Sequence, residues 1–237
     1  MKRILTLIIG FLLLGMLPVV TAQDDQSEDN RIFGLVVVNE ADVRAGPDFA
    51  YPIVGRLPRN ASVEVLGRAG DFFRRWDGRQ WLQIDFGVRR AWIYARLLRT
   101  SNPFNSIPPT GRILPRDGDG RVPDVFDLSV DICSTWVGDF TLSGNFLAGD
   151  TELIVTYPEL PGANVYSVIV IDPSGFRTAF DSTTNTATIL LDRLPSEGGT
   201  YTWRVAPYWT DRPRRSSWQQ ICLLQTGGTF EKPDENP

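Results

Sequence analysis

Residues 81–86, Trp-Leu-Gln-Ile-Asp-Phe, are the stretch of sequence that decides the fold class. In an extended strand, successive side chains point to opposite faces of the sheet. One face therefore receives the apolar side chains Leu82, Ile84 and Phe86, and the other receives Trp81, Gln83 and Asp85. This alternation predicts a β-strand with one face in a hydrophobic core and the other in water.

Short runs of the same kind recur along the chain, between clusters of Gly, Pro, Asn and Asp. They are rich in Val, Ile, Thr, Tyr and Trp, the residue types that favour strands. The runs are 35–38, 62–66, 81–86, 153–157, 165–171, 186–191, 201–207 and 219–224. After residue 22, no window of ten or more residues places its apolar residues at helical spacing. We therefore expect an all-β protein.

Three stretches without apolar periodicity separate these runs into blocks. Residues 23–30 carry four acidic side chains and no apolar one, which predicts a disordered leader. Residues 101–124 concentrate prolines and glycines, which predicts a linker stiffened by proline. The polar residues 226–237 are expected to form a disordered tail. Two folded blocks remain, at 31–100 and 125–225.

The first 22 residues have the pattern of an export signal. Lys2 and Arg3 precede the uncharged stretch 4–20, and the small residues of Val20-Thr21-Ala22 suit a signal peptidase. We expect a signal-peptide helix that is removed, leaving a protein that is secreted or held in the cell envelope. The alternative is an uncleaved segment, which would be the chain's only contact with the membrane.

The composition excludes several kinds of chemistry. The 237 residues include no histidine and only two cysteines, so a Ser-His-Asp triad, a Cys-His pair and a histidine-held zinc or haem site are excluded. We expect no catalytic residue, no cofactor and no metal. The net charge of −4 argues against nucleic acid as a partner. In an exported chain, Cys133 and Cys222 are expected to form one disulfide, and two buried free thiols are the alternative.

The first block carries an ordered set of motifs. They are Ala41-Asp42-Val43-Arg44-Ala45-Gly46-Pro47, Tyr51-Pro52-Ile53-Val54-Gly55-Arg56-Leu57, Val63-Glu64-Val65-Leu66-Gly67, Trp81-Leu82-Gln83-Ile84 and Ala91-Trp92-Ile93. Their order and spacing resemble the bacterial SH3 (SH3b) family, with Asp42 where Asn is usual and Ala91 where Gly is usual. The resemblance implies a small SH3-like barrel over 31–100 that binds cell-wall peptides or acts as a targeting domain beside an enzyme. Gly46 and Pro47 are expected to end a strand, since Gly accepts a positive φ and Pro lacks an N–H.

The first block holds more aromatic rings than a barrel of about 70 residues can bury, because small domains leave much of their surface exposed. Several rings are therefore expected at the surface, where Trp and Tyr beside Arg suit recognition of a peptide or a sugar. The candidate ligand-binding rings are Tyr51, Phe73, Trp76, Trp81 and Trp92. Their candidate partners for carboxylate groups are Arg44, Arg74, Arg75 and Arg79. The alternative is that the rings only cap the ends of the barrel.

The second block also contains recognisable motifs. They are Leu153-Ile154-Val155-Thr156-Tyr157-Pro158, Leu160-Pro161-Gly162-Ala163, Val165-Tyr166-Ser167-Val168-Ile169-Val170, Leu194-Pro195 and Gly199-Thr200-Tyr201-Thr202-Trp203-Arg204-Val205. They resemble fibronectin type III-like domains, which implies an immunoglobulin-like β-sandwich over 125–225. Tyr201 would be the corner tyrosine, bonding back to the chain near Leu194. Cys133 would lie near the start of the block and Cys222 on its last strand, where a disulfide closing about 90 residues would contribute on the order of 4 kcal/mol.

An acidic stretch between the blocks partly resembles exported calcium-binding repeats. Its carboxylates are Asp117, Asp119, Asp124 and Asp127. Arg121 interrupts the ligand spacing, and calcium needs six or more oxygens, so a solvated turn is the default interpretation.

The leading hypothesis is a non-enzymatic exported protein whose SH3b module recognises a cell-wall or cell-surface peptide, such as peptidoglycan. The second block would be a spacer or a second contact. The first alternative is an adaptor or assembly subunit that binds another exported protein. A wall hydrolase that uses two carboxylates is the third possibility.

Overall fold

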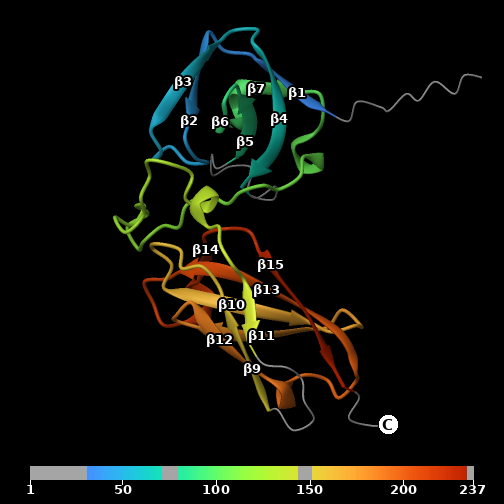
Figure 1. Cartoon of the computed structure of the whole chain (residues 1–237). Helices are drawn as coiled ribbons and strands as arrows, with labels where there is room; N and C mark the ends of the chain where they lie inside the picture. The colour runs from blue at the N-terminus through green and yellow to red at the C-terminus, as the bar shows by residue number, and fades with distance from the viewer. Residues whose placement is uncertain (1–30, 71–79, 144–150, 234–237) are drawn as a thin grey trace, which may run out of the picture. The chain divides into compact units, whose positions relative to one another are not determined.

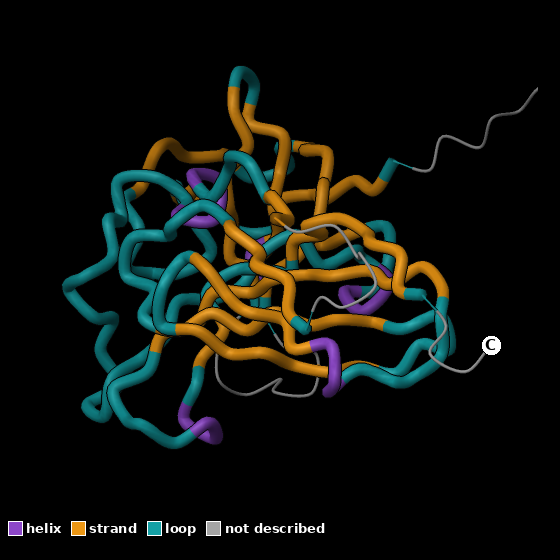
Figure 2. The backbone as a smooth tube through the Cα atoms, turned by 60° about the horizontal axis from the view of Figure 1, so that its bottom comes forward, coloured by secondary structure: helices purple, strands orange, loops and turns teal. Residues whose placement is uncertain are grey.

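The computed structural model describes residues 31–70, 80–143 and 151–233. The predicted signal peptide and leader lie outside these residues. The all-β prediction is confirmed, because the helical segments of the described part are short 3-10 turns between strands (Figure 2). In the same ranges, no helix is long and apolar enough to span a membrane.

The first seven strands form one antiparallel sheet (Figure 1). They are β1 (Ile32–Val36), β2 (Glu40–Arg44), β3 (Ile53–Pro58), β4 (Ser62–Ala69), β5 (Trp81–Phe86), β6 (Arg89–Tyr94) and β7 (Leu98–Thr100), with the 3-10 turns η1 (Ala95–Leu97) and η2 (Phe104–Ser106). Their order in the sheet is β3-β2-β6-β5-β4-β1-β7. The strand predicted at 81–86 is β5, and it pairs with β6 so that Leu82 lies opposite Ile93.

One face of this sheet carries a hydrophobic core built as the alternation predicts. Leu82 and Ile84 of β5 and Ile93 of β6 are buried in it. We call this the inner face. Ile107, from the predicted linker, joins the same core.

Part of the opposite face, which we call the outer face, is covered as well, so the prediction that it is wet is wrong at Trp81. Trp81, Ala69 and Trp92 form a second buried cluster there, and Ile113 packs against it. Gln83 is buried beside them. Asp85, at the far end of the same strand, is exposed as expected.

The covering chain comes from the predicted linker. The Arg68 N–H donates to the Pro108 carbonyl at 2.9 Å, and the Thr110 N–H donates to the Arg68 carbonyl at 2.9 Å. A Cβ built on Gly111 would lie 2.6 Å from the Trp92 ring, so the backbone there touches the indole. Residues 107–116, which we call the strap, therefore pack on the sheet and are not a free spacer.

The remaining strands form two further antiparallel sheets. The strands are β8 (Thr141–Ser143), β9 (Glu152–Thr156), β10 (Val165–Ile171), β11 (Arg177–Ser182), β12 (Thr186–Leu190), β13 (Gly199–Trp209), β14 (Gln219–Gln220) and β15 (Gln225–Lys232), with the 3-10 turns η3 (Ile132–Thr135), η4 (Leu191–Arg193) and η5 (Arg215–Ser217). The three-stranded sheet has the order β12-β9-β8, and the five-stranded sheet has the order β11-β10-β13-β14, with β15 also on β13.

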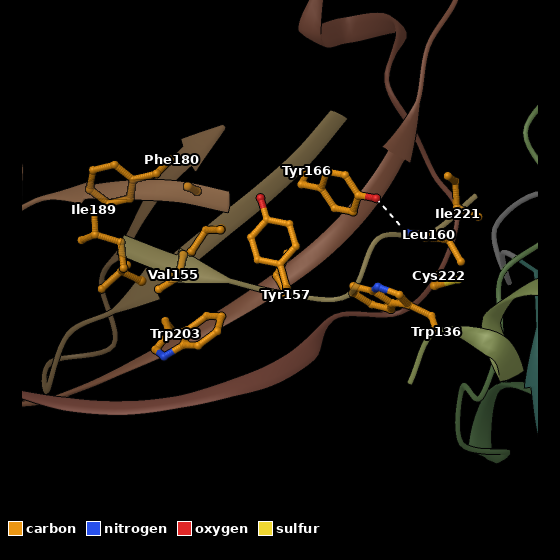
Figure 3. Packing of buried hydrophobic residues seen from close by; sticks show 14 of the residues in the cluster. Trp136, Val155, Tyr157, Leu160, Tyr166, Phe180, Ile189, Trp203, Ile221 and Cys222 are labelled. Atoms are coloured by element: carbon orange, nitrogen blue, oxygen red, sulfur yellow. Dashed lines mark hydrogen bonds between the residues drawn. The ribbon is translucent and has the colours of Figure 1, made fainter. Parts of the chain in front are cut away.

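The two sheets share one core (Figure 3). Val155 of β9 and Ile189 of β12 come from the smaller sheet, and Trp203 of β13 comes from the larger one. The buried Tyr166 hydroxyl accepts the Leu160 N–H at 2.8 Å, so this polar group is satisfied inside the core. The likeness of this part to fibronectin type III domains stays a prediction.

The end of the chain corrects two boundaries. The stretch 219–224 is not one strand, because β14 stops at Gln220 and Ile221 and Cys222 turn into the core. The predicted disordered tail is ordered up to Lys232, since β15 pairs with β13. The 11-residue β13 offers a long edge, and backbone pairing along it orders a polar segment that has no apolar pattern.

Two specific expectations about the second block are confirmed. Cys133 and Cys222 form a disulfide with a Cα–Cα distance of 5.5 Å, although Cys133 lies in η3 and Cys222 lies between β14 and β15. The Tyr201 hydroxyl donates to the Glu197 carbonyl at 2.8 Å and lies 3.2 Å from the Pro195 carbonyl, close to Leu194.

Candidate functional site

The predicted ligand-binding residues divide into three groups. Tyr51, Trp81 and Trp92 are described, and each is only 1% exposed. Arg44 is described and partly buried. The others, Phe73, Trp76, Arg74, Arg75 and Arg79, lie outside the described residues.

The prediction that Tyr51, Trp81 and Trp92 form an exposed docking surface is therefore wrong. The expectation that some rings must lie at the surface assumed that the first block is surrounded by water on all sides. The strap and the chain that follows it supply extra covering surface, so more rings are buried than a barrel of about 70 residues could bury alone.

Trp92 fastens the downstream chain to the outer face. Its Nε1–H donates to Asp131 Oδ2 at 2.9 Å, and the other carboxylate oxygen accepts the Cys133 N–H at 3.1 Å. Burial raises the pKa of Asp131, and the hydrogen bonds from Trp92 and Cys133 partly oppose that rise. The indole thus has a structural role that a surface ring would not have.

Tyr51 belongs to the core of the second block. Its ring packs in the same cluster as Ile132, and its hydroxyl oxygen accepts the Ile132 N–H at 3.5 Å. Burial is the main cause of the raised pKa of Tyr51. A Cβ on Gly46 would lie 2.4 Å from this ring. Gly46 is therefore required because any side chain at this position would clash with the Tyr51 ring. The φ angle of Gly46 is not positive, which differs from the expectation.

Arg44 braces the loop that follows β2. Its Nη1 donates to the Phe49 carbonyl at 2.9 Å and to the Tyr51 carbonyl at 2.7 Å. A carboxylate of Asp42 lies 3.6 Å from its Nη2. Much of the hydrogen-bonding capacity that was expected to meet a ligand carboxylate is therefore used within the chain.

The same loop is pinned from its other side by Asp48. Its Oδ1 accepts a hydrogen bond from the Ala50 N–H at 2.9 Å. Its Oδ2 accepts a hydrogen bond from Nη2 of Arg116, in the strap, at 2.5 Å. The Asp48 side chain is only 4% exposed, so this ion pair is largely shielded from water. The loop has a fixed shape before any ligand arrives.

Phe49 is the aromatic ring that this loop presents to solvent. It is 57% exposed. Its ring centroid lies 4.9 Å from that of Trp81 and 5.2 Å from that of Tyr94, both in edge contacts, and the Arg44 guanidinium carbon lies 5.6 Å from it. We call Phe49 and the partly exposed Tyr94 the Phe49 patch, and the buried Trp81 supports the Phe49 ring from beneath.

Phe49 was not singled out from the sequence, and the signal for it was its place in the loop. It follows Gly46 and Pro47, which lie in the loop after β2, and it precedes Tyr51, which goes into the core. Because the residues before and after Phe49 are held in place, Phe49 is the aromatic residue of this loop that can point toward solvent.

The acidic stretch between the blocks forms turns. Asp117 Oδ1 accepts the N–H groups of Asp119 at 3.0 Å and Arg121 at 2.8 Å. Asp127 accepts the Ser129 N–H, a bond that lowers the pKa of Asp127. Within residues 31–70, 80–143 and 151–233, no group of three or more acidic or cysteine side chains could hold a metal ion.

Residues 39–99 match the family model of the bacterial SH3 domain. The matched range begins just before β2 and ends within β7, so this part of the chain is a bacterial SH3 domain. No curated protein and no solved structure matches the chain. The domain suggests a module that binds peptidoglycan or peptide, and together with the disulfide it is consistent with an extracytoplasmic protein.

Proposed function

We propose that this is an exported, non-enzymatic binding protein whose SH3 domain docks a cell-wall or cell-surface peptide on the Phe49 patch. The observation that carries the proposal is the Phe49 ring, which is more than half exposed yet held by edge contacts to Trp81 and Tyr94. The bacterial SH3 match supports the class of ligand.

The geometry suits binding for two reasons. Covering an exposed aromatic ring removes apolar surface from water, a gain of about 25 cal/mol per Å². Because Arg44 and Asp48 already fix the loop, little conformational entropy is lost when the ligand arrives.

A pull-down on purified wall sacculi tests the proposal. We expect sacculi to retain the wild-type chain and to release Phe49→Ala, with binding at least about 10-fold weaker, equivalent to 1.4 kcal/mol. Phe176→Ala is the matched control, since Phe176 is 64% exposed in the second block, outside the SH3 domain, and its loss should not change retention. Thermal unfolding of each variant checks that the fold is intact.

Two outcomes would overturn the proposal. If sacculi never retain the wild type, wall binding is wrong, and a single cross-linked protein product in intact cells would favour an adaptor instead. If Phe49→Ala binds like the wild type, the Phe49 patch is not the contact. A band of cleared wall in a zymogram would contradict the non-enzymatic part of the proposal.

A further inference from the structure

A cleft of about 530 Å³ lies between the outer face of the SH3 domain and the segments joined by the disulfide. Its walls come from β5 and β6 on one side and from the stretches around Cys133 and Cys222 on the other. Clefts of this size hold small ligands in many proteins. It is separate from the Phe49 patch, because neither Phe49 nor Tyr94 lines it.

Gln83 is the first sign that the cleft is built for a ligand. Its residue is 8% exposed, and its side-chain amide makes no hydrogen bond to any described residue. No fully buried side-chain nitrogen or oxygen in the described ranges lacks a partner, so the Gln83 amide must reach the open space of the cleft. A peptide amide is the natural partner for it, since both groups donate and accept.

Arg90 is the second sign. It lines the cleft, is exposed, and its guanidinium forms no ion pair or hydrogen bond within residues 31–70, 80–143 and 151–233. Its neighbour Arg89 also lines the cleft and donates to the Val54 carbonyl at 3.0 Å. A guanidinium presents a planar pair of donors that match the two oxygens of a carboxylate.

Asp131 is the acidic side chain among the lining residues, and it does not cancel the arginines. Its two oxygens are taken by the N–H groups of Trp92 and Cys133. Burial also raises the pKa of its carboxyl, which disfavours the charged form. The charged residues that line the cleft are two arginines and one aspartate, so their net charge is positive.

The walls of the cleft are held in place by covalent and polar contacts. The Cys133–Cys222 disulfide joins the two segments of one wall, and the Trp92–Asp131 hydrogen bond ties that wall to the SH3 domain. A site held in this way loses little entropy when a ligand binds.

We infer that this cleft is a second binding site, which takes the carboxylate end of a short peptide. Arg90 receives the carboxylate, and Gln83 pairs with the adjoining peptide amide. The ligand chemistry is a free carboxylate next to an amide, which occurs in wall peptides and at protein C-termini.

Calorimetric titration of the purified chain with N-acetyl-Ala-Ala tests the inference. The same peptide with a C-terminal amide is the ligand control. We expect the acid to bind at least 10-fold more tightly than the amide. Arg90→Gln should weaken binding of the acid at least 10-fold, whereas Arg99→Gln, an exposed arginine of β7 outside the cleft, should leave it unchanged.

Gln83→Met gives an independent measure of the second contact. It should weaken both peptides about fivefold, because it removes the amide pairing that they share. If it destabilises the fold, Arg90→Gln still decides, since Arg90 is exposed and its side chain forms no hydrogen bond or ion pair with the described residues. Equal binding of acid and amide, no heat at 20-fold excess of peptide, or an unchanged affinity for Arg90→Gln would each overturn the site.

Titration with soluble wall fragments and with free-acid peptides copied from exported proteins separates the two sources of ligand. Binding of either source supports the site. If neither source binds, the site is contradicted. Phe49→Ala should leave these titrations unchanged, so failure of the cleft and failure of the Phe49 patch can be told apart.

Discussion

Both faces of the SH3 sheet bury a cluster of side chains, but different parts of the chain cover them, and a cleft remains on the outer face. The inner face is covered mainly by the domain's own strands, with Leu82 and Ile84 at its centre. The outer face is covered by the strap and by the segment around Asp131, which follow the domain in sequence. Alternation along a strand shows which side chains share a face, but it does not show what will cover that face.

The largest expected effect tests whether the two faces contribute equally to stability. Trp92→Ala on the outer face should lower the free energy of unfolding by about 3–5 kcal/mol, and Leu82→Ala on the inner face by about 2–5 kcal/mol, because both remove a buried side chain. Chemical denaturation measures both. A Trp92→Ala protein as stable as the wild type would show that the outer face is open to water.

Removal of the disulfide should affect the outer face of the SH3 sheet more than the inner face. Replacing Cys133 and Cys222 by Ser should cost on the order of 4 kcal/mol in the chain-entropy model, since the bridge closes 89 residues of sequence separation. Hydrogen exchange should increase more at the outer-face residue Trp92 than at the inner-face residue Ile84. Equal increases at both would contradict separate covering layers.

A smaller effect is expected from the ion pair that ties the strap to the SH3 domain. Arg116→Gln leaves the buried Asp48 carboxylate without its cation and should cost about 1–3 kcal/mol. The control is Arg56→Gln, whose pairs with Glu40 and Asp42 are exposed, so it should cost less than about 1 kcal/mol. Thermal unfolding compares the stability of the two variants. Equal losses of stability would show that the Asp48 carboxylate is accessible to water.

The smallest effect concerns pH. Because the folded chain raises the pKa of Asp131, the protonated carboxyl is favoured by folding, and this stabilisation is lost as the pH rises through the raised pKa. The melting temperature of the wild type relative to Asp131→Asn should therefore fall as the pH is raised from below to above 3.8, the ordinary pKa of an Asp carboxyl. A relative melting temperature that rises over this range would show that the carboxylate is stabilised by the fold.

Much of the architecture could be predicted from the sequence. The strands at 81–86 and 165–171 are β5 and β10 with the predicted bounds, because each has a local apolar pattern and clear flanking turns. The Cys133–Cys222 pair followed from the cysteine count and the predicted export. The order of the SH3 motifs identified the first domain.

The rest depended on contacts between distant residues. Nothing local to Trp92 shows that Asp131 will accept its N–H, and nothing in residues 225–232 shows that the edge of β13 needs a partner. Phe49 could not be chosen over Trp81, since both are aromatic and only the packed structure decides which one is covered. Candidate sites based on ring counts therefore fail where another segment covers the domain.

The central claim is that downstream chain covers the outer face and hydrogen-bonds the Trp92 indole. Exchange of the Trp92 Nε1–H with deuterium, followed by NMR and assigned with Trp92→Phe, tests it most directly. The structure predicts that this proton persists at least about 100-fold longer than a free indole N–H, as expected for a group that exchanges only when the structure opens. Exchange at the rate of free indole would contradict the account.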